Sequence, residues 1–165
     1  MVSYDAARMQ LLAQEEYGLR CLLQVALHRG SEPLSIQAVA EREGLSPEYS
    51  AKLMRALRQA GLVLSTRGAA GGYRLSRPPE QITVWEVIQA LGGSLYTDAF
   101  CESHPGQLRD CVHTTSCSIR GLWLSVESAI RGVLDRVTLA DLARSGAPLV
   151  PGIDAPPERP TVTSR

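Results

Sequence analysis

The sequence predicts a mainly α-helical protein with a small β-hairpin, organised as a winged helix-turn-helix followed by a long dimerisation helix. Three observations support this fold class: two short helices joined by Gly44-Leu45-Ser46, a glycine-rich hairpin pattern directly after them, and one long amphipathic helix further on. We expect a winged-helix domain over 1–81, a linker helix, cysteine loop and dimerisation helix over 82–145, and a disordered tail over 146–165.

The first elements follow from apolar spacing and capping residues. Residues 15–29 repeat leucine and alanine at helical spacing, and Gly30 is expected to end that helix. Residues 35–43 form a second helix that Ser35 caps, and Ser46-Pro47 begins a third one that ends at Gly61.

A hairpin follows the third helix. Residues 62–65 and 73–76 show short strand patterns on either side of a glycine-rich turn, and a hairpin in this place is a wing. Next, Thr83-Val84-Trp85-Glu86 has the capping-box form and begins a helix that ends at Gly92-Gly93.

Residues 118–135 predict a long helix with apolar residues at steps of three and four, a stripe suited to a partner helix. We expect the apolar stripe to include Val137, and Thr138 is expected to cap a final short helix. We expect a homodimer whose interface includes Ile119, Leu122, Trp123, Val126, Ile130 and Val133.

Charge is balanced over the whole chain but basic in one segment. The 165 residues include 17 Lys and Arg and 17 Asp and Glu, and this formal net charge of zero argues by itself against a nucleic-acid binder. Residues 46–77, however, contain six basic residues and one acidic residue, a local charge of +5. The second helix of a helix-turn-helix enters the major groove, and a wing contacts the backbone or minor groove. We therefore expect double-stranded DNA as a partner.

The expected orientation of the third helix selects the DNA-contacting residues. With Tyr49, Leu53 and Leu57 turned inward, its outward positions include Ser50 and Ala51. The expected DNA-binding residues are Ser46, Glu48, Ser50, Lys52, Arg55, Arg67, Gly71 and Gly72.

No run of 18 apolar residues is present and the N-terminus has no leader pattern, so we expect a cytoplasmic protein without a membrane span.

Three cysteines, Cys101, Cys111 and Cys117, lie close together, and Cys21 lies alone in an apolar helix where it is expected to pack as a small hydrophobe. In a reducing compartment this pattern favours a metal site over disulfides, and thiolates favour an iron–sulfur cluster or zinc. The fourth ligand could come from His104, His113 or Cys21.

Three stretches of the sequence resemble a known family: EEYGLRCLLQVAL, LSPEYSAKLMRALRQAGLVLSTRGAAGGYRLSRP and CSIRGLWLSVESAI. Together with the wing motif Arg67-Gly68-x-x-Gly71-Gly72-Tyr73, they resemble winged-helix iron–sulfur transcription regulators of the IscR, NsrR and RirA type over about residues 12–143. The resemblance implies a homodimer on a near-palindromic operator. It also implies a 2Fe–2S or 4Fe–4S cluster held by Cys101, Cys111 and Cys117, although the interval after Cys101 is longer than the family's usual one.

The fourth cluster ligand differs among the regulators that the chain resembles. One member places a His three residues after the last cysteine, where this chain has Arg120. Others use an acidic residue of the partner subunit near the start of the first helix, a position that matches Glu16, and one adds a His four residues later, where this chain has Arg20. The resemblance therefore implies Glu16 as the metal ligand, with His104 or His113 as alternatives. An ordinary first-turn glutamate complementing the helix dipole would look the same.

The resulting expectation is a DNA-binding regulator, acting as a repressor, whose operator affinity depends on an iron–sulfur cluster that senses redox state, nitric oxide or iron. The alternative on the same fold is a zinc-bound or metal-free thiol regulator that uses Cys111 and Cys117. A dimeric adaptor that binds protein is a further alternative. The sequence contains no phosphate-binding loop, His-Glu-x-x-His or Gly-x-Ser-x-Gly motif, so we do not expect an enzyme.

Overall fold

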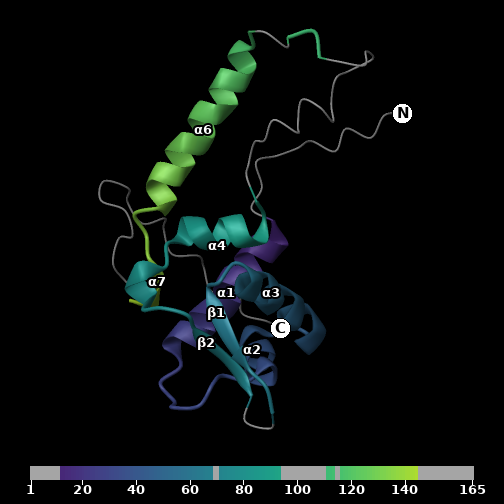
Figure 1. The fold of residues 1–165 in the computed structure, drawn as a ribbon, viewed down its shortest axis with the longest axis vertical. Coiled ribbons are helices and arrows are strands. Elements are labelled where there is room, and N and C mark those ends of the chain that lie inside the picture. Colours follow the sequence, from purple (N-terminus) through teal and green to yellow (C-terminus); the bar gives the residue numbers. More distant parts are fainter. Residues whose placement is uncertain (1–11, 69–70, 94–110, 114–115, 145–165) are drawn as a thin grey trace, which may run out of the picture.

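The computed structural model describes residues 12–68, 71–93, 111–113 and 116–144. They form a mostly helical body with one antiparallel hairpin; helix α6 projects from one end of this body and the hairpin lies at the other (Figure 1). Cys101, His104 and the expected tail 146–165 lie outside the described residues.

The helix-turn-helix is confirmed, and its caps are those that the sequence predicts. It consists of α2 (Ile36–Glu43) and α3 (Pro47–Gln59). Ser35 Oγ and Ser46 Oγ each accept a backbone N–H bond at 3.2 Å, from the third residue after the cap. Gly44 ends α2 with φ +65°, a left-handed conformation that suits a residue without Cβ.

Helix α1 (Ala13–Leu27) packs against both of these helices. It ends three residues earlier than Gly30 because the backbone of His28 is already extended, with ψ 118°. The expected role of Gly30 as the end of this helix is therefore wrong.

Strands β1 (Val63–Thr66) and β2 (Gly72–Leu75) pair in antiparallel register. Tyr73 also exchanges two backbone hydrogen bonds with Leu34, at 2.8 and 3.0 Å, which fastens the hairpin to the segment before α2. A Cβ on Gly72 would lie 2.5 Å from the Leu34 carbonyl oxygen. Gly72 is therefore required by close packing inside the protein, and not only by an approach to DNA.

The rest of the described chain contains a 3-10 turn η1 (Pro79–Gln81), α4 (Val84–Leu91), α6 (Ser118–Leu134) and α7 (Leu139–Ala143). The predicted capping box of Thr83 and Glu86 begins α4. The main core joins α1, α2, α3, α4, α7 and the hairpin and includes Leu22, Met54 and Leu57, which are fully buried. No helix among the described residues is long and apolar enough to cross a membrane.

Candidate nucleic-acid interface and cysteine site

The exposed face of α3 is strongly polar. Glu48, Lys52 and Arg55 are exposed, and Ala51 between them is half-buried. The opposite face packs into the core through Leu53, Met54 and Leu57. With exposed Arg58 nearer its C-terminus, this helix therefore presents one acidic, one small and three basic side chains outward.

Ser50 does not belong to that exposed face. It is fully buried, and its hydroxyl has no hydrogen-bond partner of normal geometry among the described residues. It lies against the Cys21 thiol of α1. Ser50 precedes Leu53 by three residues and Met54 by four, so it lies on the buried stripe. The expectation that Ser50 faces DNA is wrong, and the same spacing could have shown this from the sequence.

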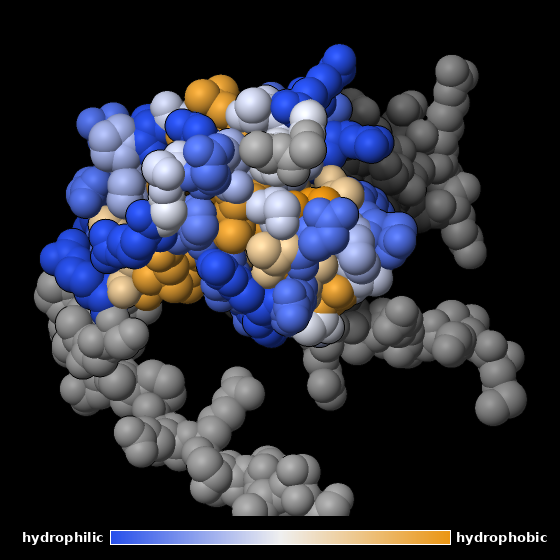
Figure 2. Space-filling view, turned by 90° about the horizontal axis from the view of Figure 1, so that it is seen from below, coloured by the Kyte–Doolittle hydropathy of each residue, from blue (hydrophilic) through white to orange (hydrophobic). Residues whose placement is uncertain are grey.

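The hairpin places Arg67 beside α3, across a shallow hollow. This hollow is lined by Ile36 and Gln37 of α2, Ala51 of α3 and the hairpin residues from Ser65 to Gly68 and from Gly71 to Tyr73. The Gly71 N–H donates to the Gly68 carbonyl at 2.9 Å and closes the described part of the turn. Figure 2 shows the end of the molecule formed by α2 and the hairpin, where hydrophilic residues surround a smaller apolar strip.

The basic side chains divide into an unpaired group and a paired group. Within the described ranges, the basic residues of α3 and the hairpin form no ion pair or side-chain hydrogen bond; they are Lys52, Arg55, Arg58, Arg67 and Arg74. Arg20, Arg77, Arg131 and Arg144, in contrast, each lie within 3.1 Å of a carboxylate oxygen. Unpaired cations on one face are available to phosphates.

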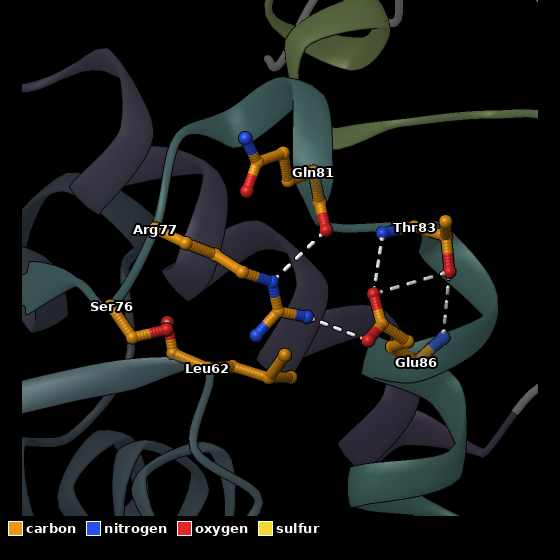
Figure 3. A network of polar contacts seen from close by, with 6 residues as sticks. All are labelled: Leu62, Ser76, Arg77, Gln81, Thr83 and Glu86. Atoms are coloured by element: carbon orange, nitrogen blue, oxygen red, sulfur yellow. Dashed lines mark hydrogen bonds and ion pairs between the residues drawn. The ribbon is translucent and has the colours of Figure 1, made fainter.

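Arg77 counts in the basic segment of the sequence but turns away from the hairpin. Its Nη2 lies 2.6 Å from Glu86 Oε1, and its Nε donates to the Gln81 carbonyl at 3.0 Å (Figure 3). Glu86 also accepts the Thr83 N–H at 3.0 Å within the capping box. Arg77 therefore joins the end of the hairpin to α4.

A polar network joins α1 to the helix-turn-helix. Arg20 Nε donates to Glu43 Oε2 at 2.6 Å, and Gln24 Nε2 donates to Glu43 Oε1 at 2.5 Å. The Glu43 side chain is only 7% exposed, and its hydrogen bond raises the pKa of Arg20 above the usual value. The guanidinium lies 5.5 Å from the Tyr17 ring, which in turn meets the Tyr49 ring edge-on at 6.1 Å. Sequence reasoning missed Glu43, because only the tertiary fold places it beside Arg20.

Glu16 lies on the exposed side of the first turn of α1, near enough for its charge to act on Arg20. Neighbouring Glu15, in contrast, is buried and accepts the Leu12 N–H at 2.8 Å. Of the two glutamates, Glu16 is the one available to an external group.

Cys111 and Cys117 are free, half-buried thiols. Cys117 caps α6, and its Sγ accepts the Arg120 N–H at 3.3 Å. The described residues contain no group of three metal-binding side chains, and Cys101 and His104 lie outside them. Exposed His113 lies two residues after Cys111.

Cys21 differs from the other described cysteines. It is fully buried, and desolvation raises the pKa of its thiol from 9.0 to about 11. A thiol that keeps its proton is a poor ligand and nucleophile. This agrees with the expectation that Cys21 is a packing residue.

Helix α6 contacts α4 near its C-terminal end, where Arg131 lies 5.9 Å from the Trp85 ring. It has no buried residue. The side chains of Ile119, Leu122 and Trp123 are 59%, 57% and 45% exposed. Val137, which the sequence groups with this stripe, instead lies beyond α6 in a second core cluster with Val84 and Ile88.

Comparison with known proteins gives a consistent result. A family model described as Rrf2, iron-dependent transcriptional regulator, matches residues 11–145. Protein rrf2 of Nitratidesulfovibrio vulgaris is 37% identical over 139 residues, which are 84% of this chain and 90% of that protein. The chain is also similar to regulators of known structure.

Two solved structures share the fold. CymR (YrzC), described as the global cysteine regulator of B. subtilis, matches with a TM-score of 0.64 and 32% identity over 82% of this chain and 97% of that one. T. potens IscR matches with a TM-score of 0.62 and 36% identity over 81% of this chain and 85% of that one. The fold class is thereby confirmed, and the relatives are regulators of transcription and not enzymes.

Proposed function

Because the chain belongs to the Rrf2 family of transcriptional regulators, we propose that it is a cytoplasmic homodimeric repressor whose operator affinity depends on an iron–sulfur cluster. The proposed ligands are Cys101, Cys111 and Cys117 of one subunit and Glu16 of the partner subunit. The proposed signal is redox state, nitric oxide or iron status.

The observation that best supports DNA binding is that, in the described part of the chain, the basic residues of α3 and the hairpin are unpaired, whereas several of those elsewhere are paired with carboxylates. The cations of α3 and the hairpin have no partner among the described residues, whereas Arg20, Arg77, Arg131 and Arg144 are paired with acids. Phosphate contacts supply most of the affinity of a DNA-binding protein, and they require free cations on one surface. Helix α3 and Arg67 present such a surface to the major groove and to the adjacent strand.

The described cysteines fit an iron–sulfur cluster in their chemistry. Cys111 and Cys117 are free and half-buried, and thiolates are the usual ligands of such clusters. The Arg120 N–H bonded to Cys117 Sγ is the kind of hydrogen bond that tunes ligating sulfur. The cluster would supply reversible electron transfer and reactivity toward nitric oxide. A carboxylate ligand would bind its iron more weakly than a thiolate does.

The network at Arg20 provides a route from Glu16 to the DNA-binding helices. Glu16 and Glu43 both act on Arg20, and Glu43 is the last residue of α2 before the Gly44 turn. Binding of Glu16 to a metal would remove one acidic neighbour from Arg20. This would change the strength of the ion pair between Arg20 and Glu43. We propose that this alters the placement of α2 and α3, which makes operator affinity a two-state property.

The proposed dimer rests on the exposed apolar stripe of α6. Ile119, Leu122 and Trp123 are each more than two-fifths exposed, and leaving such side chains in water is unfavourable compared with packing them against a second copy.

The test is an anaerobic visible spectrum with iron and sulfide analysis of the full-length protein. We expect a coloured protein whose cluster is lost in Cys117→Ala and retained in Cys21→Ala, since Cys21 is buried with a protonated thiol. We expect Glu16→Ala to lose or destabilise the cluster and Glu41→Ala, another exposed helical acid, to retain it. Equal operator affinity of cluster-bound and cluster-free protein would contradict the proposed control.

A thiol-based regulator is the second candidate, favoured by the structural similarity to CymR, a cysteine regulator. In that case Cys111 and Cys117 would be oxidised reversibly, without iron. A colourless protein, with zinc or without metal, whose operator affinity changes on mild oxidation would support this candidate. Cys21→Ser is its control, because that buried thiol should not respond.

A further inference from the structure

We propose that Ala51 and Lys52 of α3 determine which operator sequence is recognised: Ala51 contacts the methyl group of a thymine, and Lys52 donates to O6 and N7 of a guanine. The inference rests on DNA binding by α3 and adds to it the identity of the bases. It assigns one T·A pair and one G·C pair to each half-site.

The burial of Ser50 fixes the face that α3 turns outward. With Ser50, Leu53, Met54 and Leu57 buried, the positions facing outward between Glu48 and Leu57 include Ala51, Lys52 and Arg55. They follow each other at helical steps of three and four, so they form one strip along the helix. A recognition helix meets base edges with the residues of its N-terminal half, and Ala51 and Lys52 lie there, five and six residues after the Ser46 cap.

The hollow between α3 and the hairpin fixes how this strip lies on DNA. Ala51 lines the hollow together with Gln37 and the base of the wing at Arg67. A helix in the major groove and a wing residue at the minor groove lie on the two sides of one sugar–phosphate strand. The hollow has the position that this strand would occupy, so Ala51 is the α3 residue nearest to the bases of that strand.

Ala51 is suited to contact a thymine methyl group. Its own side chain is a single methyl group, whereas the other outward positions of the strip, Glu48, Lys52 and Arg55, carry long side chains. A short apolar side chain in the major groove allows close approach and favours the C5 methyl of thymine, which no other base carries. A polar or larger residue at this position would either select a different base or hold α3 away from the groove.

Lys52 is suited to read guanine because its ammonium group is free. It is exposed and has no carboxylate partner among the described residues. Lysine has only donors, and guanine presents two adjacent acceptors in the major groove. Lys52 lies next to Ala51 in the N-terminal half of α3 and outside the lining of the hollow, so we assign it to a different base from Ala51. Arg55, one turn later, lies in the C-terminal half of α3, beyond the N-terminal residues that meet base edges, and it serves as the matched control.

The experiment begins with selection of an operator from random duplex DNA by the full-length protein. Each thymine of the selected half-site is then replaced by uracil, which lacks only the methyl group, and each guanine by 7-deazaguanine, which lacks N7. We expect one uracil position to weaken binding about threefold to fourfold, the effect of one buried methyl group. We expect one 7-deazaguanine position to weaken binding at least about fivefold.

The variants assign these effects to residues. In Ala51→Gly the uracil effect should disappear, and in Lys52→Met the 7-deazaguanine effect should disappear. Arg55→Met should bind all sequences more weakly and keep both effects. The proposal is overturned if no uracil or 7-deazaguanine position matters, if the effects persist in the Ala51 and Lys52 variants, or if Arg55→Met removes the guanine effect.

The proposed function fails in a different way. If DNA binding itself were absent, selection would give no operator and no salt-dependent complex would form. A selected operator whose modified bases all bind normally would leave the regulator intact and refute only the base assignment.

Discussion

A buried hydroxyl group without a hydrogen-bond partner destabilises the folded state, and Ser50 carries one where α3 packs against α1. We expect Ser50→Ala to raise the free energy of unfolding by about 1 kcal/mol in urea denaturation. Because the side chain does not face solvent, operator affinity should stay the same.

Ser46→Ala is the control for this prediction. It removes the cap that accepts the Tyr49 N–H, so it should lower stability by about 1 kcal/mol. Weaker operator binding by a well-folded Ser50→Ala protein would show that Ser50 contacts DNA after all.

Cys21 makes stability depend on pH in the alkaline range. Its pKa is about 11 in the folded protein against an ordinary value of 9.0, so the unfolded chain releases the proton first as pH rises. The contribution of Cys21 is fully present below pH 9 and is lost between pH 9 and 11. We expect the free energy of unfolding to fall by about 1 kcal/mol more between pH 8 and 10 in the wild type than in Cys21→Ala.

The same burial predicts how the cysteines react with iodoacetamide. At pH 8 the native protein should be alkylated at Cys111 while Cys21 stays unmodified, as mass spectrometry of peptides can show. Rapid alkylation of Cys21 in the native protein would contradict the burial seen here.

Among the helices and strands, the sequence predicts well those features that depend on residues close together along the chain. The caps at Ser35, Ser46 and Thr83 are correct because their acceptors and donors are three residues apart. The predictions of the glycine-rich hairpin and of the long amphipathic helix are also correct, because both depend on patterns within one short segment of the chain. The end of α1 is less well predicted, since His28 and not Gly30 follows the last helical residue.

Contacts between distant segments are what the sequence does not predict. Arg20 and Glu43 lie 23 residues apart, and the pairing of Arg77 with Glu86 depends on how the hairpin meets α4. Counting charges along the sequence therefore does not distinguish Arg77 from Arg67. The candidate metal site depends on several segments, including Cys101 outside the described residues, so its ligand set remains a prediction.

Helix α6 carries the apolar stripe of the proposed dimer interface. Ile130 lies on the apolar stripe, and Ser128 lies on the other side of the helix. We expect Ile130→Asp to weaken dimerisation by roughly two orders of magnitude, since a carboxylate would be buried at the interface. Ser128→Asp adds the same charge and should leave the dimer intact. Sedimentation analysis over a range of concentrations measures both, and equal dissociation of the two variants would place the interface elsewhere.

For the whole molecule, Arg67 and Arg77 form a matched pair. Both belong to the basic segment, but Arg67 has no partner among the described residues and Arg77 is bound to Glu86. We expect Arg67→Ala to weaken operator binding and to reduce the slope of log K against log salt by about one unit per subunit.

Arg77→Ala should keep that slope and lower stability by less than about 1 kcal/mol, because its ion pair is partly exposed. Fluorescence anisotropy of labelled operator at several salt concentrations compares the two. Similar slopes for both variants would mean that pairing with Glu86 does not decide which cation meets DNA.

The separation of free and paired cations has a consequence for how the protein meets its target. Since the chain has no formal net charge, beyond the Debye length of about 8 Å it is neither strongly attracted to DNA nor repelled by it. Closer in, the unpaired side of α3 and the hairpin is attracted and the acidic remainder is repelled. The encounter therefore exerts a torque: a molecule arriving with the wrong face is turned before contact, and binding gains orientation without a large excess of positive charge.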